Sequence, residues 1–217
     1  MQRQLERIVI FANGDLPDPE KARRLLQRED YIICADGGTR HAWALHIQPH
    51  LIIGDMDSAE PEQLEAFQKA HVPLEIYPHD KNATDLELAL NHAIDLNPER
   101  IIILAALGGR LDQTLANITL LSNSRLQELD VRLDDGIEEV FLCRDQAQIG
   151  GKSGDLVSLI PWQGAALGIQ TTGLKWPLQE EPLFPEKTRG LSNEMLGETA
   201  SVVITSGLLL IVHRRQS

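Results

Sequence analysis

Five short apolar segments in the first half of the chain each run directly into a loop of glycine and polar residues. The segments span residues 7–12, 31–35, 51–53, 74–77 and 100–107. The loops that follow them are Asn13-Gly14-Asp15, Asp36-Gly37-Gly38, Gly54-Asp55-Met56-Asp57-Ser58, Asp80-Lys81-Asn82-Ala83-Thr84-Asp85 and Gly108-Gly109-Arg110-Leu111-Asp112. Segments rich in Ile and apolar on both faces are typical of buried parallel strands. In an open parallel sheet all five loops fall at one edge, where α/β proteins bind ligands.

Helical patterns separate these segments. In residues 85–96 the apolar positions recur at i, i+3, i+4, i+7 and i+8, which gives one apolar stripe. Residues 61–70 and 111–128 show similar patterns. The alternation predicts a doubly wound, mostly parallel sheet with right-handed crossovers.

The second half of the chain has a different pattern. Asp135-Gly136 is a hairpin signal between residues 131–134 and 137–143. Further strand candidates, separated by Gly, Pro and Ser, span residues 146–149, 156–160, 165–170 and 201–213. We therefore expect an α/β domain over residues 1–128, followed over residues 129–217 by a small antiparallel β-sandwich or barrel domain.

Charge and apolar content restrict the partners of the chain. A net charge of −12 over 217 residues repels nucleic acid and anionic lipid, so we expect neither as a partner. No segment approaches the roughly 18 apolar residues of a membrane span, and the apolar run at residues 8–12 is too short for a secretion signal. The two cysteines, Cys34 and Cys143, lie in apolar runs and are expected to be reduced. We expect a cytoplasmic protein.

Two of the loops carry paired carboxylates. Asp55 and Asp57 directly follow an apolar segment and can both turn toward one Mg²⁺, which prefers hard oxygen ligands. Alternatively, Asp57 or Ser58 caps the helix that begins near residue 61.

In the next loop, Asp80 could bind a metal and Lys81 a phosphate. The alternative there is a capping box, because Thr84-Asp85-Leu86-Glu87 has the pattern that opens a helix without any chemistry. His79, beside this loop, is a possible proton carrier.

A glycine-rich turn precedes the helical pattern of residues 111–128. Gly108 and Gly109 allow close backbone approach, and the N-terminus of a helix attracts phosphate. Arg110 can hold phosphate oxygens through two hydrogen bonds. The alternative is an ordinary turn in which Asp112 caps the helix. Asp36-Gly37-Gly38 is a similar but weaker signal.

Taken together, these motifs resemble the thiamine pyrophosphokinase family. The motifs are Asp36-Gly37-Gly38, Gly54-Asp55-x-Asp57-Ser58, Asp80-Lys81-x-x-Thr84-Asp85, Gly109-Arg110-x-Asp112, Gly173-Leu174-Lys175-Trp176 and Ser192-Asn193. The resemblance covers nearly the whole chain. One departure is Asn82, where the family commonly has Asp, and it puts in doubt a metal role for that position.

The resemblance implies a two-domain homodimer that transfers the diphosphate of ATP to the hydroxyl of thiamine, giving AMP and thiamine diphosphate. An α/β domain carries nucleotide and metal, and a β domain helps to enclose thiamine at the subunit interface. In-line transfer needs charge neutralisation, which metal and Arg supply. We expect the acidic loops to repel within themselves when no metal is bound, by roughly 4 kcal/mol per pair.

The expected site residues form three groups. The metal and catalytic group, with Mg²⁺ as the cofactor, comprises Asp55, Asp57, Asp80 and Asp85, with Arg110 and Asp112 as further catalytic residues. The group that contacts ATP and its phosphates comprises Asn13, Gly14, Asp36, Gly37, Gly38, Lys81, Thr84, Gly108, Gly109, Arg110 and Gln113. The thiamine group comprises Trp176, Ser192 and Asn193. Which aspartate takes the hydroxyl proton stays open.

Two other functions are compatible with the same residues. One is a diphosphokinase that acts on another alcohol, such as a pterin, and a panel of acceptors separates it from the thiamine enzyme. The other is a nucleotide- or thiamine-binding module without catalysis, supported only by Asn82. Binding without turnover would favour the module.

Overall fold

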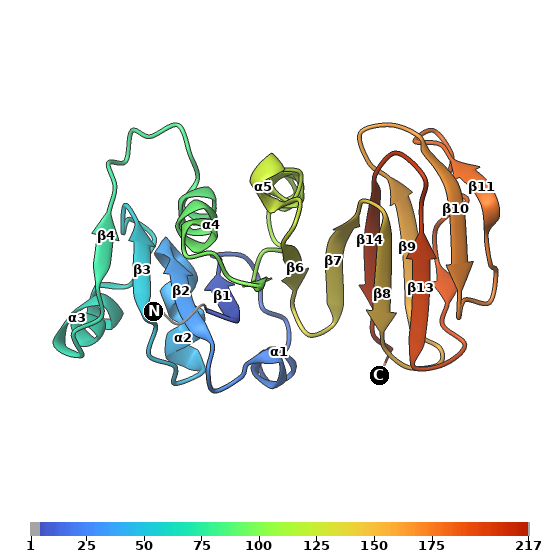
Figure 1. Cartoon of the computed structure of the whole chain (residues 1–217). Coiled ribbons are helices and arrows are strands. Elements are labelled where there is room, and N and C mark those ends of the chain that lie inside the picture. The colour runs from blue at the N-terminus through green and yellow to red at the C-terminus, as the bar shows by residue number, and fades with distance from the viewer. Residues whose placement is uncertain (1–4, 217) are drawn as a thin grey trace. The chain divides into compact units, whose positions relative to one another are not determined.

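The structure is a computed structural model that describes residues 5–216 (Figure 1). It divides into two compact units, the first ending at Gly136 and the second beginning at Ile137. Among the described residues, no helix combines the length and apolar character needed to cross a membrane.

The first unit is built on six parallel strands in the order β6-β5-β1-β2-β3-β4. The chain adds strands on one side of β1 up to β4, then returns to place β5 on the other side. The carboxyl ends of β1 and β5 therefore flank the point where strand order reverses, the usual ligand position in such sheets. The strands are β1 Arg7–Phe11, β2 Tyr31–Ala35, β3 Leu51–Gly54, β4 Leu74–Ile76, β5 Arg100–Leu104 and β6 Asp130–Asp134.

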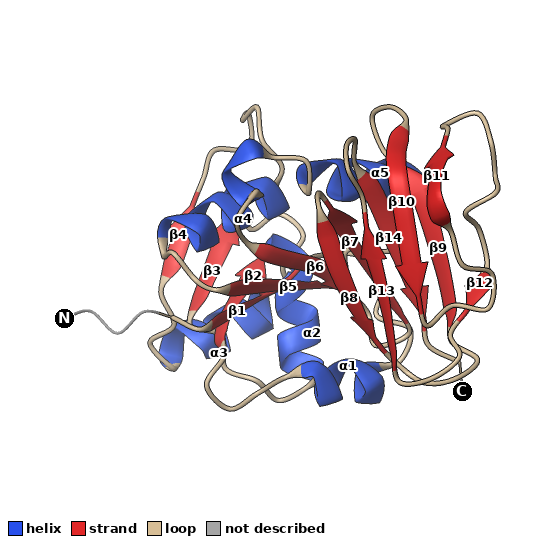
Figure 2. Ribbon diagram, turned by 45° about the vertical axis from the view of Figure 1, so that its right-hand side comes forward, coloured by secondary structure: helices blue, strands red, loops and turns tan. Residues whose placement is uncertain are grey.

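Helices cover both faces of this sheet. Figures 1 and 2 show α1, α2 and α3 on one face and α4 and α5 on the other. One core cluster joins Val9 and Phe11 of β1 to Ala42 of α2 and Phe67 of α3. The helices are α1 Pro19–Leu25, α2 Thr39–Ala44, α3 Pro61–Lys69, α4 Asp85–Asp95 and α5 Leu111–Leu120, with 3₁₀ turns at η1 Asp36–Gly38 and η2 Ser124–Leu126.

Several elements of this unit differ from the prediction. The helix expected over residues 111–128 ends at Leu120, and the side chain of Asn123 then caps the separate turn η2. Strand β6, which we had placed in the second domain, pairs in parallel with β5. Helices α1 and α2 were not predicted, because seven and six residues are too few to show an apolar period.

The second unit contains eight antiparallel strands in two sets, β12-β9-β14-β7 and β11-β10-β13-β8. Phe141, Val157 and Ile211 from the first set share one core cluster with Ile149 and Ile169 from the second. The fold class predicted from the sequence, a parallel α/β sheet followed by antiparallel β-structure, is confirmed. The strands are β7 Glu138–Cys143, β8 Gln146–Gly150, β9 Leu156–Pro161, β10 Ala166–Thr172, β11 Gln179–Leu183, β12 Asn193–Glu194, β13 Thr199–Val203 and β14 Leu209–Arg214.

The single strand expected over residues 201–213 is two strands, β13 and β14. The chain turns at Gly207, whose φ of 91° favours glycine. A Cβ at this position would lie 2.4 Å from the carbonyl oxygen of Ala165, so the turn also needs the small residue. Strands β11 and β12 were not predicted.

Candidate active site

A cavity of about 200 Å³ lies at the carboxyl edge of the parallel sheet in the first unit. It receives residues from all five loops that follow the strands, so the loops meet as their order in the sequence predicts. The predicted site residues that line it are Asn13, Gly14, Asp36, Asp55, Asp57, Thr84, Asp85, Gly108 and Gln113. It is also lined by Ala12, Ala35, Ser58, Leu86, Ala106, Ala116 and Asn117.

Three strands end beside this cavity in left-handed backbone at residues other than glycine. Asp36 follows β2 with φ 43°, Met56 lies just after β3 with φ 63°, and Ala105 follows β5 with φ 55°. Each such residue costs about 1–3 kcal/mol, and the strain concentrates at functional sites. The backbone at this edge of the sheet is therefore strained after three of its strands.

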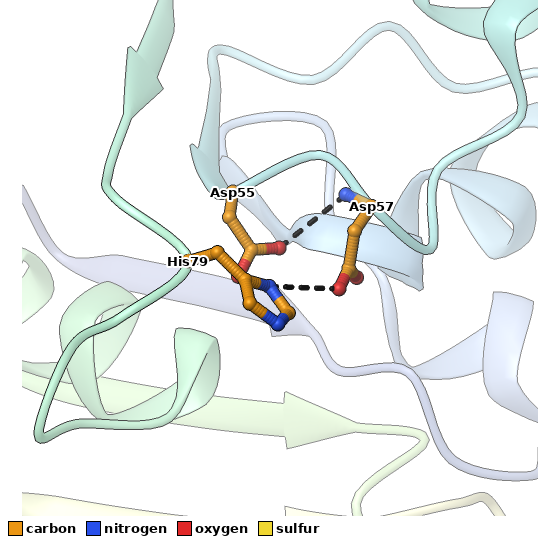
Figure 3. A group of neighbouring side chains, drawn as sticks. All are labelled: Asp55, Asp57 and His79. Atoms are coloured by element: carbon orange, nitrogen blue, oxygen red, sulfur yellow. Dashed lines mark hydrogen bonds and ion pairs between the residues drawn. The ribbon is translucent and has the colours of Figure 1, made fainter.

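Asp55, Asp57 and His79 form one group that could hold a metal ion (Figure 3). His79 Nδ1 lies 3.2 Å from Oδ2 of Asp55 and 3.2 Å from Oδ2 of Asp57. The backbone N–H of Asp57 donates to Asp55 Oδ1 at 3.3 Å, which fixes the turn between the two carboxylates.

A second group consists of Asp36, Asp55 and Asp85, so Asp55 belongs to both. Asp36 is almost fully buried, and its Oδ1 atom has no hydrogen-bond partner among the described residues. Burial raises the pKa of Asp36. Gly54 makes the group possible, because a Cβ there would lie 2.8 Å from Asp36 Cβ and 2.9 Å from Asp85 Oδ1. A buried oxygen without a donor fits a cation ligand.

Lys81 lies between two of these carboxylates and pairs with both. Its Nζ lies 2.5 Å from Asp55 Oδ2 and 3.0 Å from Asp85 Oδ1. The hydrogen bond from Lys81 lowers the pKa of Asp55 to about 2. Burial lowers the pKa of Lys81, but its bonds to Asp55 and Asp85 together raise it above its ordinary value. The repulsion that we expected among these carboxylates is thus relieved by an ammonium group at their centre.

The helix-capping alternatives have opposite outcomes. The N-cap of α3 is Glu60, and no side chain caps that helix, so neither Asp57 nor Ser58 has this role. Thr84, in contrast, does cap α4, with its Oγ1 accepting from the N–H of Glu87 at 3.1 Å. Asp57 is therefore available as a ligand, whereas Thr84 both caps the helix and lines the cavity.

The glycine turn before α5 lies beside the cavity. Gly108 and Gly109 have φ values of 79° and 69°. No side chain caps α5, so Asp112 is not its cap and the first N–H groups stay available to an anion. Arg110 and Asp112 are exposed and paired to each other, and neither lines the cavity.

Some predicted residues lie outside the cavity wall. Asp80 is exposed and belongs to neither acidic group. Gly37 and Gly38 are buried under the end of β1, because a Cβ at Gly38 would lie 2.1 Å from the carbonyl oxygen of Phe11. Asn117 was missed by the prediction; it faces the cavity from α5 and donates to the Ala106 carbonyl at 2.9 Å. Its spacing of four residues from Gln113 on one helix was the available signal.

The donor set of the two acidic groups fits a hard divalent cation. Three carboxylates and one imidazole gather around the carboxylate of Asp55, and carboxylate oxygens are the ligands that Mg²⁺ prefers. The unpartnered oxygen of Asp36 is the observation that supports this fit.

A second cavity, of about 450 Å³, lies in the second unit and includes all three predicted thiamine residues. Asn193 accepts from the Trp176 N–H at 3.0 Å and donates to the Trp176 carbonyl at 2.7 Å. The Trp176 ring is therefore anchored through its backbone while 57% of the residue stays exposed. Ser192 also lines the cavity, and its N–H donates to Ser158 Oγ at 3.0 Å.

A parallel α/β sheet with grouped carboxylates and an uncapped helix at its carboxyl edge is typical of enzymes that transfer phosphate groups from nucleotides. Two family models match the chain. The model described as thiamin pyrophosphokinase, catalytic domain, matches residues 22–133, and the model described as thiamin pyrophosphokinase, vitamin B1 binding domain, matches residues 145–209. The chain belongs to the thiamine pyrophosphokinase family.

Curated thiamine pyrophosphokinases match this chain over most of their length. A thiamine pyrophosphokinase of Bacillus subtilis is 29% identical, covering 83% of this chain and 85% of the relative. Thiamine pyrophosphokinase 1 of Oryza sativa is 28% identical, covering 95% of this chain and 87% of the relative.

Solved structures share the fold. The crystal structure of the thiamine pyrophosphokinase from Bacillus subtilis has a TM-score of 0.88 at 25% identity, covering 98% of this chain and all of that one. The thiamin pyrophosphokinase from Candida albicans has a TM-score of 0.78 at 19% identity, with 96% and 88% covered, and shows the likeness of fold alone.

The chain is thus an enzyme, a thiamine diphosphokinase. It transfers the diphosphate group of ATP to the hydroxyl of thiamine and releases AMP with thiamine diphosphate. The pterin enzyme and the non-catalytic module find no support in these comparisons.

Proposed function

We propose that the acidic cavity of the first unit binds ATP with Mg²⁺ and is the place where the diphosphate is transferred. The observation that carries this proposal is the position of Asp55, which belongs to both acidic groups within the wall of one cavity. Asp36, Asp55, Asp57 and Asp85 would hold the metal, directly or through water. Bound there, Mg²⁺ neutralises the charge that builds on the phosphate oxygens.

The phosphates of ATP would lie between the acidic groups and the glycine turn. In the transfer, the thiamine hydroxyl oxygen bonds to the β-phosphorus, the bond from that phosphorus to the oxygen bridging the α-phosphate breaks, and AMP leaves with that oxygen. The hydroxyl proton passes to a carboxylate of the cavity. Gly108, Gly109 and the first N–H groups of α5 would contact the phosphates.

Lys81 and Arg110 supply the positive charges of the proposed site. Lys81 already lies against Asp55, so the arrival of a metal would release its ammonium toward a phosphate. Arg110 would exchange its exposed partner Asp112 for phosphate oxygens. Asp80 stays a predicted ligand that would have to turn toward the metal.

In the second unit, Trp176 would stack on the cationic thiazolium ring of thiamine. An exposed indole whose backbone is held by Asn193 is a preorganised face for a cation. Lys175 Nζ lies 5.0 Å from the centre of the Trp176 indole and is paired with Glu194. It would have to move for thiamine to stack on the indole.

A homodimer and a cytoplasmic location stay predictions. Analytical ultracentrifugation tests the homodimer.

Titration calorimetry with Mg²⁺ and a slowly hydrolysed ATP analogue tests the proposal. The wild type should bind the analogue at least about tenfold more tightly with Mg²⁺ than with EDTA, since several carboxylates must be neutralised before phosphate can enter. Asp55→Asn should lose most of that difference, whereas Glu60→Gln, at an exposed residue that lines neither cavity, should keep it. Equal binding with Mg²⁺ and with EDTA would contradict the metal site.

A further inference from the structure

His213 is completely buried in the second unit, between two carboxylates. Its Nδ1 lies 3.3 Å from Glu139 Oε2, and its Nε2 lies 3.1 Å from Asp155 Oδ2. The three residues come from β14, β7 and the turn before β9, and all three side chains are almost fully buried. A buried imidazole enclosed on both sides by carboxylates needs a structural reason.

The two carboxylates beside His213, those of Asp155 and Glu139, make further contacts. Asp155 accepts from the N–H of Lys152 at 3.0 Å and of Gln216 at 2.8 Å, so it acts only as an acceptor. Burial raises the pKa of Asp155, but these bonds and the contact with His213 outweigh it and leave that pKa below its ordinary value. Glu139 Oε2 also lies 3.7 Å from the guanidinium of Arg215. Both ring nitrogens of His213 thus face carboxylate oxygens, and an ionised carboxylate accepts hydrogen bonds but cannot donate them.

Asp155 links this group to the cavity that contains Trp176. Its carbonyl accepts from the N–H of Met195 at 2.8 Å, and the N–H of Gly154 donates to the Met195 carbonyl at 2.9 Å. Met195 directly follows β12, which carries Asn193 and pairs with β9. Hydrogen bonds therefore link His213 to Asp155 and Asp155 to Met195, the backbone runs from Met195 to Asn193, and Asn193 holds Trp176.

The backbone at Gly151 packs directly against the contact between His213 and Asp155. A Cβ at Gly151 would lie 2.6 Å from Asp155 Oδ2, 2.8 Å from His213 Nε2 and 3.0 Å from Met195 Sδ. Only a residue without a side chain lets the backbone cover the His213–Asp155 contact this closely. A Cβ at the neighbouring Gly150 would meet no atom within 4 Å.

We propose that His213 is a positioning residue for thiamine: as a doubly protonated imidazole it fixes Asp155 and, through β12, the Asn193 that holds Trp176. The proposal rests on the assignment of the Trp176 cavity to thiamine. His213 touches no substrate in this role. Its loss should loosen the thiamine site and leave the ATP site of the first unit unchanged.

Steady-state kinetics of His213→Gln and Trp176→Ala test the proposal. Gln cannot donate to both carboxylates, so His213→Gln should raise KM for thiamine about tenfold, with KM for ATP within twofold of wild type. A merely structural role would lower Tm without this split between the two substrates. If Trp176→Ala raises KM for thiamine and folded His213→Gln does not, the positioning role is wrong. If Trp176→Ala leaves that KM unchanged, the cavity assignment fails and the inference fails with it.

Two further measurements do not depend on the folding of His213→Gln. Gly151→Ala should raise KM for thiamine at least fivefold, whereas the matched control Gly150→Ala should not change it. In the wild type at neutral pH, ¹⁵N NMR of the imidazoles should show one histidine with both ring nitrogens protonated, whose signal disappears in His213→Gln or, if that variant does not fold, moves in Gly151→Ala. A neutral tautomer for His213 would overturn the proposal.

Discussion

Lys81 Nζ lies 2.5 Å from Asp55 Oδ2, at the carboxylate that belongs to both acidic groups of the first unit. The ammonium therefore lies where a divalent cation would share the same oxygen. This contact makes Lys81 a competitor of a metal for Asp55.

Replacing Lys81 should make the stability of the first unit depend on metal. Lys81→Met removes the hydrogen bond to Asp55 and the ion pair with Asp85 and leaves both carboxylates without their counter-charge, so it should cost about 1.5–3 kcal/mol of unfolding free energy in EDTA. Adding Mg²⁺ should recover most of that loss. Urea unfolding with and without Mg²⁺ measures both values.

The matched control for this prediction is Lys69→Met. Lys69 pairs with Glu65 on the exposed face of α3, and such a pair contributes only about 0.3–0.5 kcal/mol. Equal losses for the two variants would contradict the central position of Lys81.

Lowering the pH should reduce the stability of the first unit, because Asp55 becomes protonated. Its pKa falls from an ordinary 3.8 to about 2 in the folded protein, so the unfolded chain binds the proton first as the pH decreases. This contribution to stability is complete above pH 3.8 and is lost as the pH falls toward 2. Asp55→Asn lacks it, so its Tm should fall less steeply than that of the wild type over this window. Parallel curves in differential scanning calorimetry would show that Asp55 is not linked to folding.

Gly38 should tolerate no side chain. The Cβ of Gly38→Ala would lie 2.1 Å from the carbonyl oxygen of Phe11, so the backbone must move, at a cost of about 1–3 kcal/mol. Gly197→Ala is the control, because a Cβ there meets nothing within 4 Å. Urea unfolding of the two variants compares them; an unchanged midpoint for Gly38→Ala would show that this turn is not tightly packed.

Trp176→Ala should raise the KM for thiamine without changing the KM for ATP. It removes the exposed indole of the second cavity, and loss of a stacking contact with a cation costs about 1–2 kcal/mol, which is about a fivefold to thirtyfold rise in KM for thiamine. KM for ATP should stay the same. Trp43→Ala removes another partly exposed tryptophan, which packs against Phe67 in the first unit, and should leave KM for thiamine unchanged. Equal rises in both KM values for Trp176→Ala would contradict its assigned role.

The positions of the loops could be predicted from the sequence, whereas the contacts within them could not. The strands β1, β2, β3 and β5 are apolar on both faces, and the parallel order of the sheet brings the following loops to one edge without further information. The partner of Asp55 could not be predicted in this way. Lys81 is 26 residues away in the sequence, and whether its ammonium faces a phosphate or a carboxylate depends on side-chain geometry.

Asp36 and His79 show the same limit. Asp36 was predicted as a nucleotide contact, which stays a prediction; that the turn η1 also buries it beside Asp55 and Asp85 was not predicted. His79 was predicted only as a proton carrier, and the structure brings it to within 3.2 Å of two carboxylates. In both cases the deciding fact is which way a loop side chain turns, which no periodic pattern of residues records.

The most direct test of the site is the turnover of Asp55→Asn beside Glu60→Gln. With Mg²⁺, ATP and thiamine, wild type and Glu60→Gln should form AMP and thiamine diphosphate in equal amounts, and AMP only when thiamine is present. Asp55→Asn should lose at least about a hundredfold in kcat, or about 3 kcal/mol of transition-state stabilisation. A folded Asp55→Asn with wild-type kcat would contradict the proposed site, and ADP in place of AMP would contradict the reaction.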